Sequence, residues 1–120
     1  MDLKELCMYC RGKKGASEGF PFGPDTLVFK VGGRMFALVG LDARVPAVNL
    51  KCDPFTAREL REKYTAVRPG YHMDKRHWNT VALDGSVPDE ELRWMVDHSH
   101  GLVVDGLGRK ARAGLGIEKS

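Results

Sequence analysis

Hydrophobic and polar side chains alternate along TLVFKVGGRMFALVG, residues 26–40, on both sides of Gly32 and Gly33. Alternation with a period of two is typical of a half-buried strand, and paired glycines favour the two-residue turn of a hairpin. Such a turn pairs Val31 with Arg34, and cross-strand partners lie on the same face of a sheet. The predicted core face holds Leu27, Phe29, Phe36 and Leu38, and the opposite face holds Lys30, Met35 and Ala37.

The rest of the chain predicts three more strands and three helices. Alternating or β-branched segments place the strands at residues 47–52, 66–68 and 77–83. A first helix is expected at residues 2–11, and a second begins at Asp53-Pro54, an N-cap followed by a first-turn proline, and runs to Lys63. A capping box from Ser86 to Asp89 starts the third helix, which ends before Gly106. Its apolar stripe is predicted to contain Leu92, Met95, Val96, Ser99, Leu102 and Val103.

This order of elements, α-β(3)-α-β(2)-α, predicts an α+β fold of two layers. Neighbouring strands joined by short turns form one antiparallel sheet, which the helices cover on one face. The other face stays open. It is expected to carry Val28, Lys30, Met35, Ala37, Asn49, Lys51, Trp78 and Thr80. The chain is interpreted as a single domain over residues 1–105, followed by a basic, Gly-rich tail over residues 106–120 that ends frayed or in a short helix.

Charge is distributed unevenly along the chain. The net charge of +3 comes entirely from the tail, so residues 1–105 hold 15 basic and 15 acidic residues. A general attraction to nucleic acid is therefore not expected, and only local clustering could supply one. Such a cluster lies between Lys51 and Asn79, where seven basic residues, Arg58 and Arg61 among them, stand against four acidic ones.

Three cysteines and the termini add little chemistry. Cys7 and Cys10 form a C-x-x-C pair, but a structural zinc site needs about four ligands and no second pair exists. Buried apolar thiols are the favoured interpretation for Cys7 and Cys10, and neither a metal nor a cofactor is expected. The start MDLKEL lacks the order of a signal peptide, and no apolar run approaches ~18 residues, so the sequence predicts a cytoplasmic protein without membrane contact.

The stretch RPGYHMDKRHWNTV, residues 68–81, concentrates the candidate chemistry. Lys75 and Arg76 could contact phosphates, Tyr71 and Trp78 could stack on bases, and Asn79 could bond a base edge. The full predicted nucleic-acid site comprises Lys30, Lys51, Arg68, Tyr71, His72, Lys75, Arg76, His77, Trp78 and Asn79.

Three other interpretations of this stretch stay open. His72, Asp74 and His77 could move protons or bind a metal, but their spacing matches no known ligand pattern, so no catalytic residue is assigned. A mixed apolar and polar sheet face also suits a protein partner or a homodimer, because aromatic and Arg residues dominate such interfaces. Finally, the histidines could simply satisfy loop carbonyls.

The segments FPFGPDTLVFKVGGRMFAL, NLKCDP, RPGYHMDKRHWNTV and DGSVPDEEL resemble the MmcQ/YjbR-like family of bacterial proteins. The resemblance extends from about Met1 to Val104 and implies a secretion-chaperone-like fold with the order of elements given above. It also implies DNA binding, the label usually given to the family, and it brings no catalytic residues. Family members often have Asn where this chain has Asp74, which places an acid inside the expected basic contact.

Overall fold

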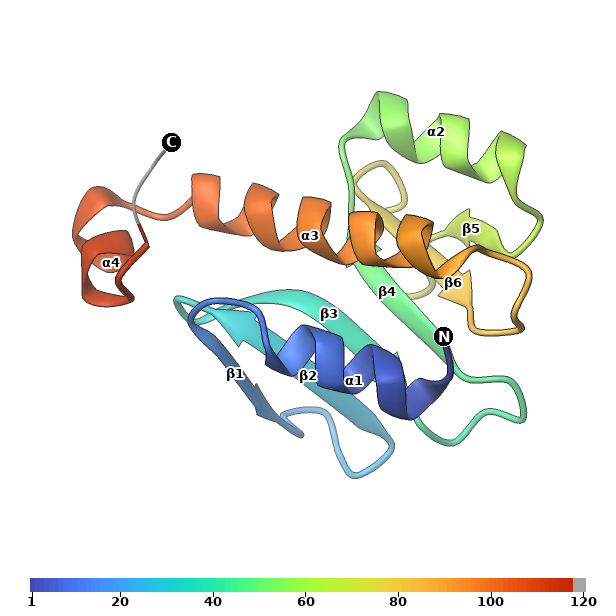
Figure 1. Ribbon diagram of the computed structural model, residues 1–120, viewed down its shortest axis with the longest axis horizontal. Coiled ribbons are helices and arrows are strands. Elements are labelled where there is room, and N and C mark those ends of the chain that lie inside the picture. Colours follow the sequence, from blue (N-terminus) through green and yellow to red (C-terminus); the bar gives the residue numbers. More distant parts are fainter. Residues whose placement is uncertain (118–120) are drawn as a thin grey trace.

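Within residues 1–117, a single sheet of six strands forms one layer and four helices form the other (Figure 1). The computed structural model describes residues 1–117. The helices are α1 (Leu3–Arg11), α2 (Pro54–Lys63), α3 (Asp89–Asp105) and α4 (Arg109–Gly114). The strands are β1 (Ala16–Gly19), β2 (Thr26–Val31), β3 (Arg34–Gly40), β4 (Ala47–Lys51), β5 (Val67–Pro69) and β6 (Trp78–Ala82).

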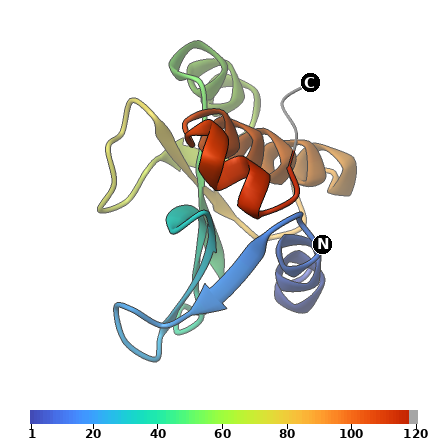
Figure 2. The ribbon, with the colours of Figure 1, turned by 90° about the vertical axis from the view of Figure 1, so that its left-hand side faces the viewer.

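The strands follow the order β1-β2-β3-β4-β6-β5, and all neighbours are antiparallel. Figure 2 shows the helices on one side of the sheet, with two loops projecting on the other. The predicted two-layer α+β fold is therefore confirmed. Strand β1 was not predicted, because its four residues include Ser17, Glu18 and Gly19 and pack no alternating apolar face.

A β-bulge changes the predicted register of the hairpin. Val31 pairs with Arg34 and Lys30 with Met35, but Phe29 then pairs with Ala37, which leaves Phe36 as an extra residue on β3. Two consecutive residues of β3 consequently face the core, and every later residue of the strand lies on the opposite face from the one predicted. Ala37 is a core residue, whereas Leu38 lies on the open side, so both expectations were wrong.

Ser99 on α3 bridges the bulge and the end of β4. Its hydroxyl donates to the Phe36 carbonyl at 2.6 Å and accepts from the Lys51 amide at 2.9 Å. Ser99 is fully buried, so these bonds satisfy a polar group that would otherwise destabilise the core. Beside it, His100 donates through Nε2 to the Lys14 carbonyl and packs edge-on against the Phe36 ring.

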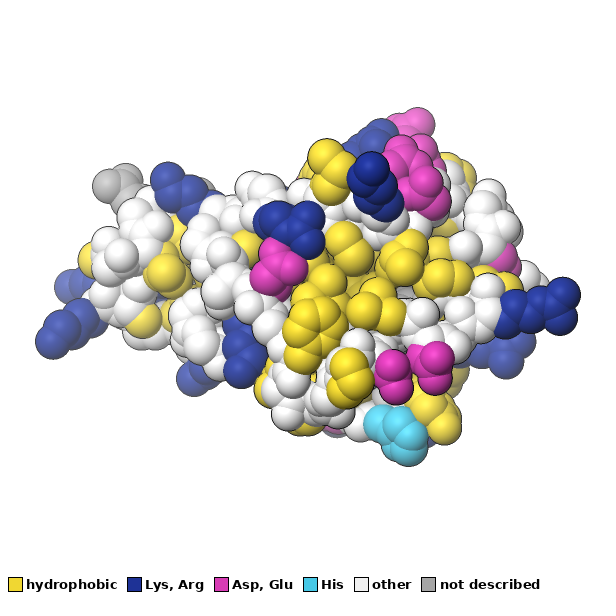
Figure 3. All heavy atoms as spheres, turned by 90° about the horizontal axis from the view of Figure 1, so that it is seen from below, with side chains coloured by type: hydrophobic (Ala, Val, Ile, Leu, Met, Phe, Trp, Pro, Cys, Tyr) yellow, Lys and Arg dark blue, Asp and Glu magenta, His cyan; other side chains and the backbone are white. Residues whose placement is uncertain are grey.

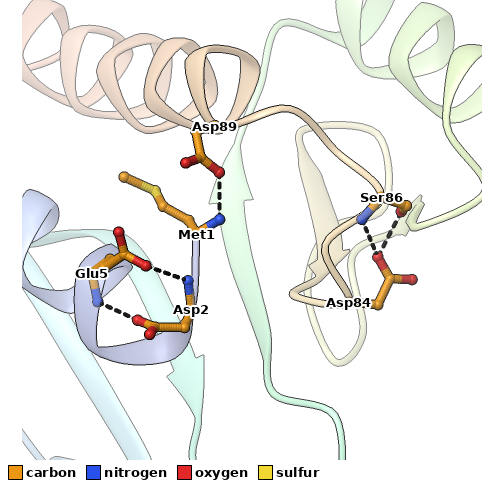
Figure 4. Close-up of polar contacts among 6 residues, drawn as sticks. All are labelled: Met1, Asp2, Glu5, Asp84, Ser86 and Asp89. Carbon is orange, nitrogen blue, oxygen red and sulfur yellow. Dashed lines mark hydrogen bonds and ion pairs between the residues drawn. The ribbon is translucent and has the colours of Figure 1, made fainter.

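The helix starts differ from expectation in one place (Figure 4). Asp2 and Glu5 form a capping box at α1, and Asp53 caps α2 through the Thr56 amide. At α3, however, the predicted capping box is absent, because Ser86 bonds the Asp84 carboxylate instead and Pro88 takes the N-cap position. The amino group of Met1 contacts Asp89 and ties the start of α1 to the start of α3.

Three apolar residues of the predicted tail, Leu107, Leu115 and Ile117, pack against the rest of the domain. Leu107 is 6% exposed and lies over the hairpin turn, where a Cβ on Gly32 would come within 2.6 Å of it. After the short α4, Leu115 and Ile117 pack against the core. Residues 118–120 of the predicted tail lie outside the described residues. Within the described part of the tail, α4 is the short helix that the sequence offered as one alternative.

The three cysteines are buried in the core, as expected for Cys7 and Cys10. Burial raises the pKa of the Cys10 thiol to about 12 and that of Cys52 to about 11, and it also raises the pKa of Cys7. These thiols stay neutral at physiological pH and act as small apolar side chains.

Candidate functional site

The loop between β5 and β6, residues 70–77, folds back over the open face of the sheet. Its first residue, Gly70, donates its amide to the Trp78 carbonyl at 2.8 Å, and a Cβ there would lie 2.7 Å from the Trp78 Cβ. The Tyr71 amide then donates to Thr80 Oγ1 at 2.8 Å, and Asn49 Nδ2 donates to the Tyr71 carbonyl at 3.3 Å. Polar groups on β4 and β6 therefore hold the loop against the sheet.

Trp78 lies on the open side of the sheet, but the loop covers it. Its side chain is 9% exposed and forms a second apolar cluster with Val28 and Leu38, against which Met35 and Met73 pack. A ring enclosed in this way cannot stack on a base, so Trp78 supports the loop and is not a contact residue of the predicted nucleic-acid site.

Asn79 also departs from its predicted role, because its side chain faces the helical layer. It is 2% exposed, donates to the Ala57 carbonyl at 3.3 Å and accepts from Arg61 Nε at 2.7 Å. The Arg61 guanidinium also donates to the Lys75 and Trp78 carbonyls. Arg61 thus fixes the second half of the loop to α2, and Asn79 is not available to a base edge.

A basic pocket lies between α2 and the second half of this loop. It has a volume of about 620 Å³ and is lined by Pro54, Phe55, Arg58, Arg61, Lys75 and Arg76. Lys75 Nζ donates to the Gly70 carbonyl at 3.0 Å, and the Phe55 ring is 72% exposed. Arg58 and Arg76 are exposed and form no ion pair within residues 1–117.

An apolar groove occupies the open face on the other side of the loop, with a volume of about 670 Å³. Figure 2 shows the two loops that flank this face, residues 20–25 and 70–77, projecting away from the helices. The apolar lining comprises Phe22, Met35, Leu38, Ala43, Ala47, Tyr71 and Met73. The polar lining comprises Asp25, Thr26, Asp42, Asn49, His72 and Thr80.

The predicted nucleic-acid residues are therefore divided between two surfaces. Lys75 and Arg76 line the basic pocket, whereas Tyr71 and His72 line the apolar groove. Lys30 pairs with Met35 and Lys51 with Trp78, so both lie at the end of the sheet where the loop begins. Arg68 is exposed on the edge strand β5.

Sequence reasoning counted Arg58 and Arg61 in a basic cluster but did not assign them to a site. Their spacing of three residues on one helix was the available signal, since such residues share a helix face. Phe55 precedes Arg58 by three residues on the same helix, so the same signal was available for it. Asp25 and Asp42 carried no comparable signal, because their proximity depends on how loops fold.

The histidines have local partners. His77 Nδ1 lies 2.8 Å from the Asp74 carboxylate, and this contact, with the Arg76 amide, lowers the pKa of Asp74. His98 accepts from the Asp53 amide, and burial lowers its pKa. His72 has a positive φ of 60°, and its ring lies 4.0 Å from that of Tyr71.

Within residues 1–117, no group of three or more His, Cys, Asp or Glu side chains is arranged to hold a metal ion. In the same part of the chain, none of the helices has the length and apolar character needed to cross a membrane.

Comparisons with known proteins identify the family. The sequence profile of the YjbR family matches residues 11–102. The uncharacterized protein YjbR of Escherichia coli K12 is 38% identical over 93% of this chain and 95% of its own length. The uncharacterized protein YbdF of Escherichia coli O157:H7 is 41% identical over 76% of this chain and 75% of its own length.

Solved structures agree with this assignment. The crystal structure of the DUF419 protein DR2400 of Deinococcus radiodurans has a TM-score of 0.91 and 38% identity, covering 99% of this chain and 91% of that one. A crystal structure from Pseudomonas syringae has a TM-score of 0.76 and 28% identity, covering 86% of this chain and 99% of that one. The chain belongs to the YjbR family.

Proposed function

We propose that this protein binds DNA without catalysing a reaction, and that the basic pocket receives the phosphates. The observation that carries the proposal is the convergence of four cationic side chains, Arg58, Arg61, Lys75 and Arg76, on one pocket. In bacteria such as those of its relatives, DNA lies in the cytoplasm, and the proposal therefore places the protein there.

The four cations divide into two roles. Arg61 donates to Asn79 and to the Trp78 carbonyl, and Lys75 donates to the Gly70 carbonyl, so these two side chains hold the pocket in shape. Arg58 and Arg76 are exposed, and their guanidinium groups can bond phosphate oxygens in pairs. A phosphate meets these groups without first breaking an ion pair within residues 1–117.

Phe55 favours single-stranded DNA over a duplex. Its ring is 72% exposed and lines a pocket in which every charged lining residue is a cation. Stacking of a base on such a ring contributes about 1–3 kcal/mol and needs an unpaired base. Contact with phosphates on one side and with a base on the other is the arrangement typical of proteins that bind single strands without base preference.

The test is fluorescence anisotropy of labelled single-stranded and duplex oligonucleotides, measured across salt concentrations. Arg58→Ala with Arg76→Ala should weaken binding and should lower the slope of log K against log salt by about 1.4, about 0.7 for each lost contact with a single strand. Phe55→Ala should weaken binding of the single strand more than binding of the duplex. The matched control is Arg44→Ala with Arg109→Ala, which removes two exposed arginines outside the pocket. The proposal fails if wild type does not bind at low salt or if both double variants behave alike.

A homodimer is the second candidate function, and a different surface favours it. Figure 3 shows hydrophobic side chains gathered in the middle of the side seen from below, with basic side chains toward both ends. Phe20 and Phe22, on the loop after the edge strand β1, are 52% and 63% exposed. Large exposed apolar patches mark interaction sites. Sedimentation over a range of concentrations should show a dimer that Phe20→Ser with Phe22→Ser abolishes, and a wild-type monomer at every concentration would exclude it.

A further inference from the structure

The apolar groove on the open face carries charge of one sign. Among the described residues that line it, the Asp, Glu, Lys and Arg side chains are Asp25 and Asp42 only. Both side chains are exposed, and neither forms an ion pair within residues 1–117. The groove therefore attracts cations and the basic pocket attracts anions. The 70–77 loop lies between the two sites.

The remaining lining suits an apolar body. Phe22 and Tyr71 contribute aromatic rings, Met35 and Met73 contribute flexible thioethers, and Leu38 completes the apolar surface. Thioether side chains adapt to ligands of different shape. The volume of about 670 Å³ is that of a site for a small organic molecule, since such sites measure roughly 300–1,000 Å³.

The polar groups between the strands are already satisfied by one another. Thr80 donates to Asn49 Oδ1, Asn49 donates to the Tyr71 carbonyl, and Thr80 Oγ1 accepts from the Tyr71 amide. These groups hold the loop and do not require a polar ligand. The carboxylates of Asp25 and Asp42 are left as the groups that distinguish one ligand charge from another.

We propose that this groove is a binding site for a small organic cation, an amine with an apolar body. The ammonium group lies against Asp25 and Asp42, and the body lies on Met35, Leu38 and Met73. Aromatic rings add to the attraction, because the faces of Phe22 and Tyr71 favour a cation over a neutral group. This site is separate from the basic pocket and does not depend on DNA binding.

The experiment uses three probes with the same apolar body, titrated into the isotopically labelled full chain and followed by amide chemical shifts. The probes are 4-phenylbutylamine, the neutral 4-phenylbutanol and the anionic 4-phenylbutyrate. We expect the amine to bind most tightly and the butyrate most weakly. The amine should bind roughly tenfold more tightly than the alcohol, because two carboxylates and the aromatic faces attract its charge. The shifts should centre on Met35, Leu38, Thr80 and their neighbours.

Asp25→Asn with Asp42→Asn keeps the shape of both side chains and removes their charge. In this variant the amine should bind no more tightly than the alcohol, while the affinity of the alcohol stays unchanged. Asp105→Asn, an exposed change outside the groove, should leave all three affinities as in wild type. Arg58→Ala with Arg76→Ala should also leave amine binding intact, which separates this proposal from the DNA site.

Several outcomes would overturn the proposal. They are equal affinity for amine and alcohol in wild type, an amine affinity that survives the double Asp change, and shifts confined to residues outside the groove. Absence of binding by all three probes would overturn it as well, because the groove is open in the free protein.

Discussion

The two sides of the 70–77 loop are built in different ways. On the side of α2, the Arg61 guanidinium bonds Asn79, the Lys75 carbonyl in the loop and the Trp78 carbonyl on β6. Asn79 is buried, so these contacts fix the second half of the loop to the core. On the side of the open face, Met73 packs against the cluster of Trp78, and the polar contacts to Thr80 and Asn49 are exposed or partly buried.

The residues that support the loop therefore differ from the residues that can contact a ligand. The residues that hold the loop, Arg61, Asn79 and Trp78, are buried or partly buried. The residues that can meet a ligand lie at the rims, with Arg58 and Arg76 on one side and Asp25 and Asp42 on the other. A mixed run of aromatic and basic residues in a sequence can thus be the sum of two surfaces with opposite charge preferences.

The largest expected effect comes from removing the polar contacts on the α2 side. Asn79→Ala leaves Arg61 and the Ala57 carbonyl without their partner in a buried site, and should lower the free energy of unfolding by about 2–3 kcal/mol. Urea denaturation measures the loss. Thr80→Val, the corresponding change on the groove side, should cost about 1 kcal/mol, because Thr80 is only partly buried. Equal losses in the two variants would remove the distinction between the two sides.

A smaller effect is expected where the loop begins. Gly70→Ala places a Cβ within 2.7 Å of the Trp78 Cβ and 3.0 Å of the Trp78 carbonyl oxygen, so the loop must move away from β6. Overpacking of this kind costs about 1–3 kcal/mol. The fluorescence of Trp78 should shift to longer wavelength as water reaches its ring, and the Trp94→Phe background removes the other tryptophan. An unchanged spectrum and stability would show that the loop does not depend on this close approach.

The smallest effect concerns charge alone. Asp74→Asn removes a carboxylate next to Lys75 and Arg76, while the new side-chain oxygen can still accept from the Arg76 amide. Binding of a single-stranded oligonucleotide should tighten severalfold at low salt, and the gain should shrink as salt screens the charge. Asp42→Asn, on the groove side, is the control and should leave this affinity unchanged. A gain of the same size from both changes would mean that only net charge matters.

The hydrophobic pattern predicted most of the fold because its signals are local. Alternation placed the strands from residue 26 onward, and Asp53-Pro54 placed the start of α2. Strand β1 was missed because a short edge strand needs no apolar face, and the register of β3 was wrong because nothing around Phe36 marks a bulge.

The candidate site was less predictable, since it depends on contacts between distant segments. Sequence placed Trp78 on the open side of the sheet, but only the path of the loop shows that Met73 packs against its cluster. Asn79 was assigned to ligand binding because no partner for its side chain could be seen in the sequence. Its partner Arg61 lies 18 positions away and is brought close only by the fold. Lys75 and Arg76 are adjacent in the sequence and line one pocket, whereas Arg58 and Phe55 become their neighbours only because α2 packs beside the loop.

The extra residue at Phe36 decides which chemistry the open face presents. With the bulge, Leu38 faces the groove and Ala37 and Val39 face the core. Without it, Ala37 and Val39 would line the floor and Leu38 would enter the core, because a shift by one residue exchanges the two faces of a strand. In a relative that lacks one residue between the hairpin turn and this point, the residue aligned with Ala37 would still pair with the residue aligned with Phe29, so conserved side chains after the gap would mark the same surface as here. Alignments of the family that carry a gap at β3 can therefore be mapped onto the groove from Ala37 onward, and only the bulged residue has no counterpart.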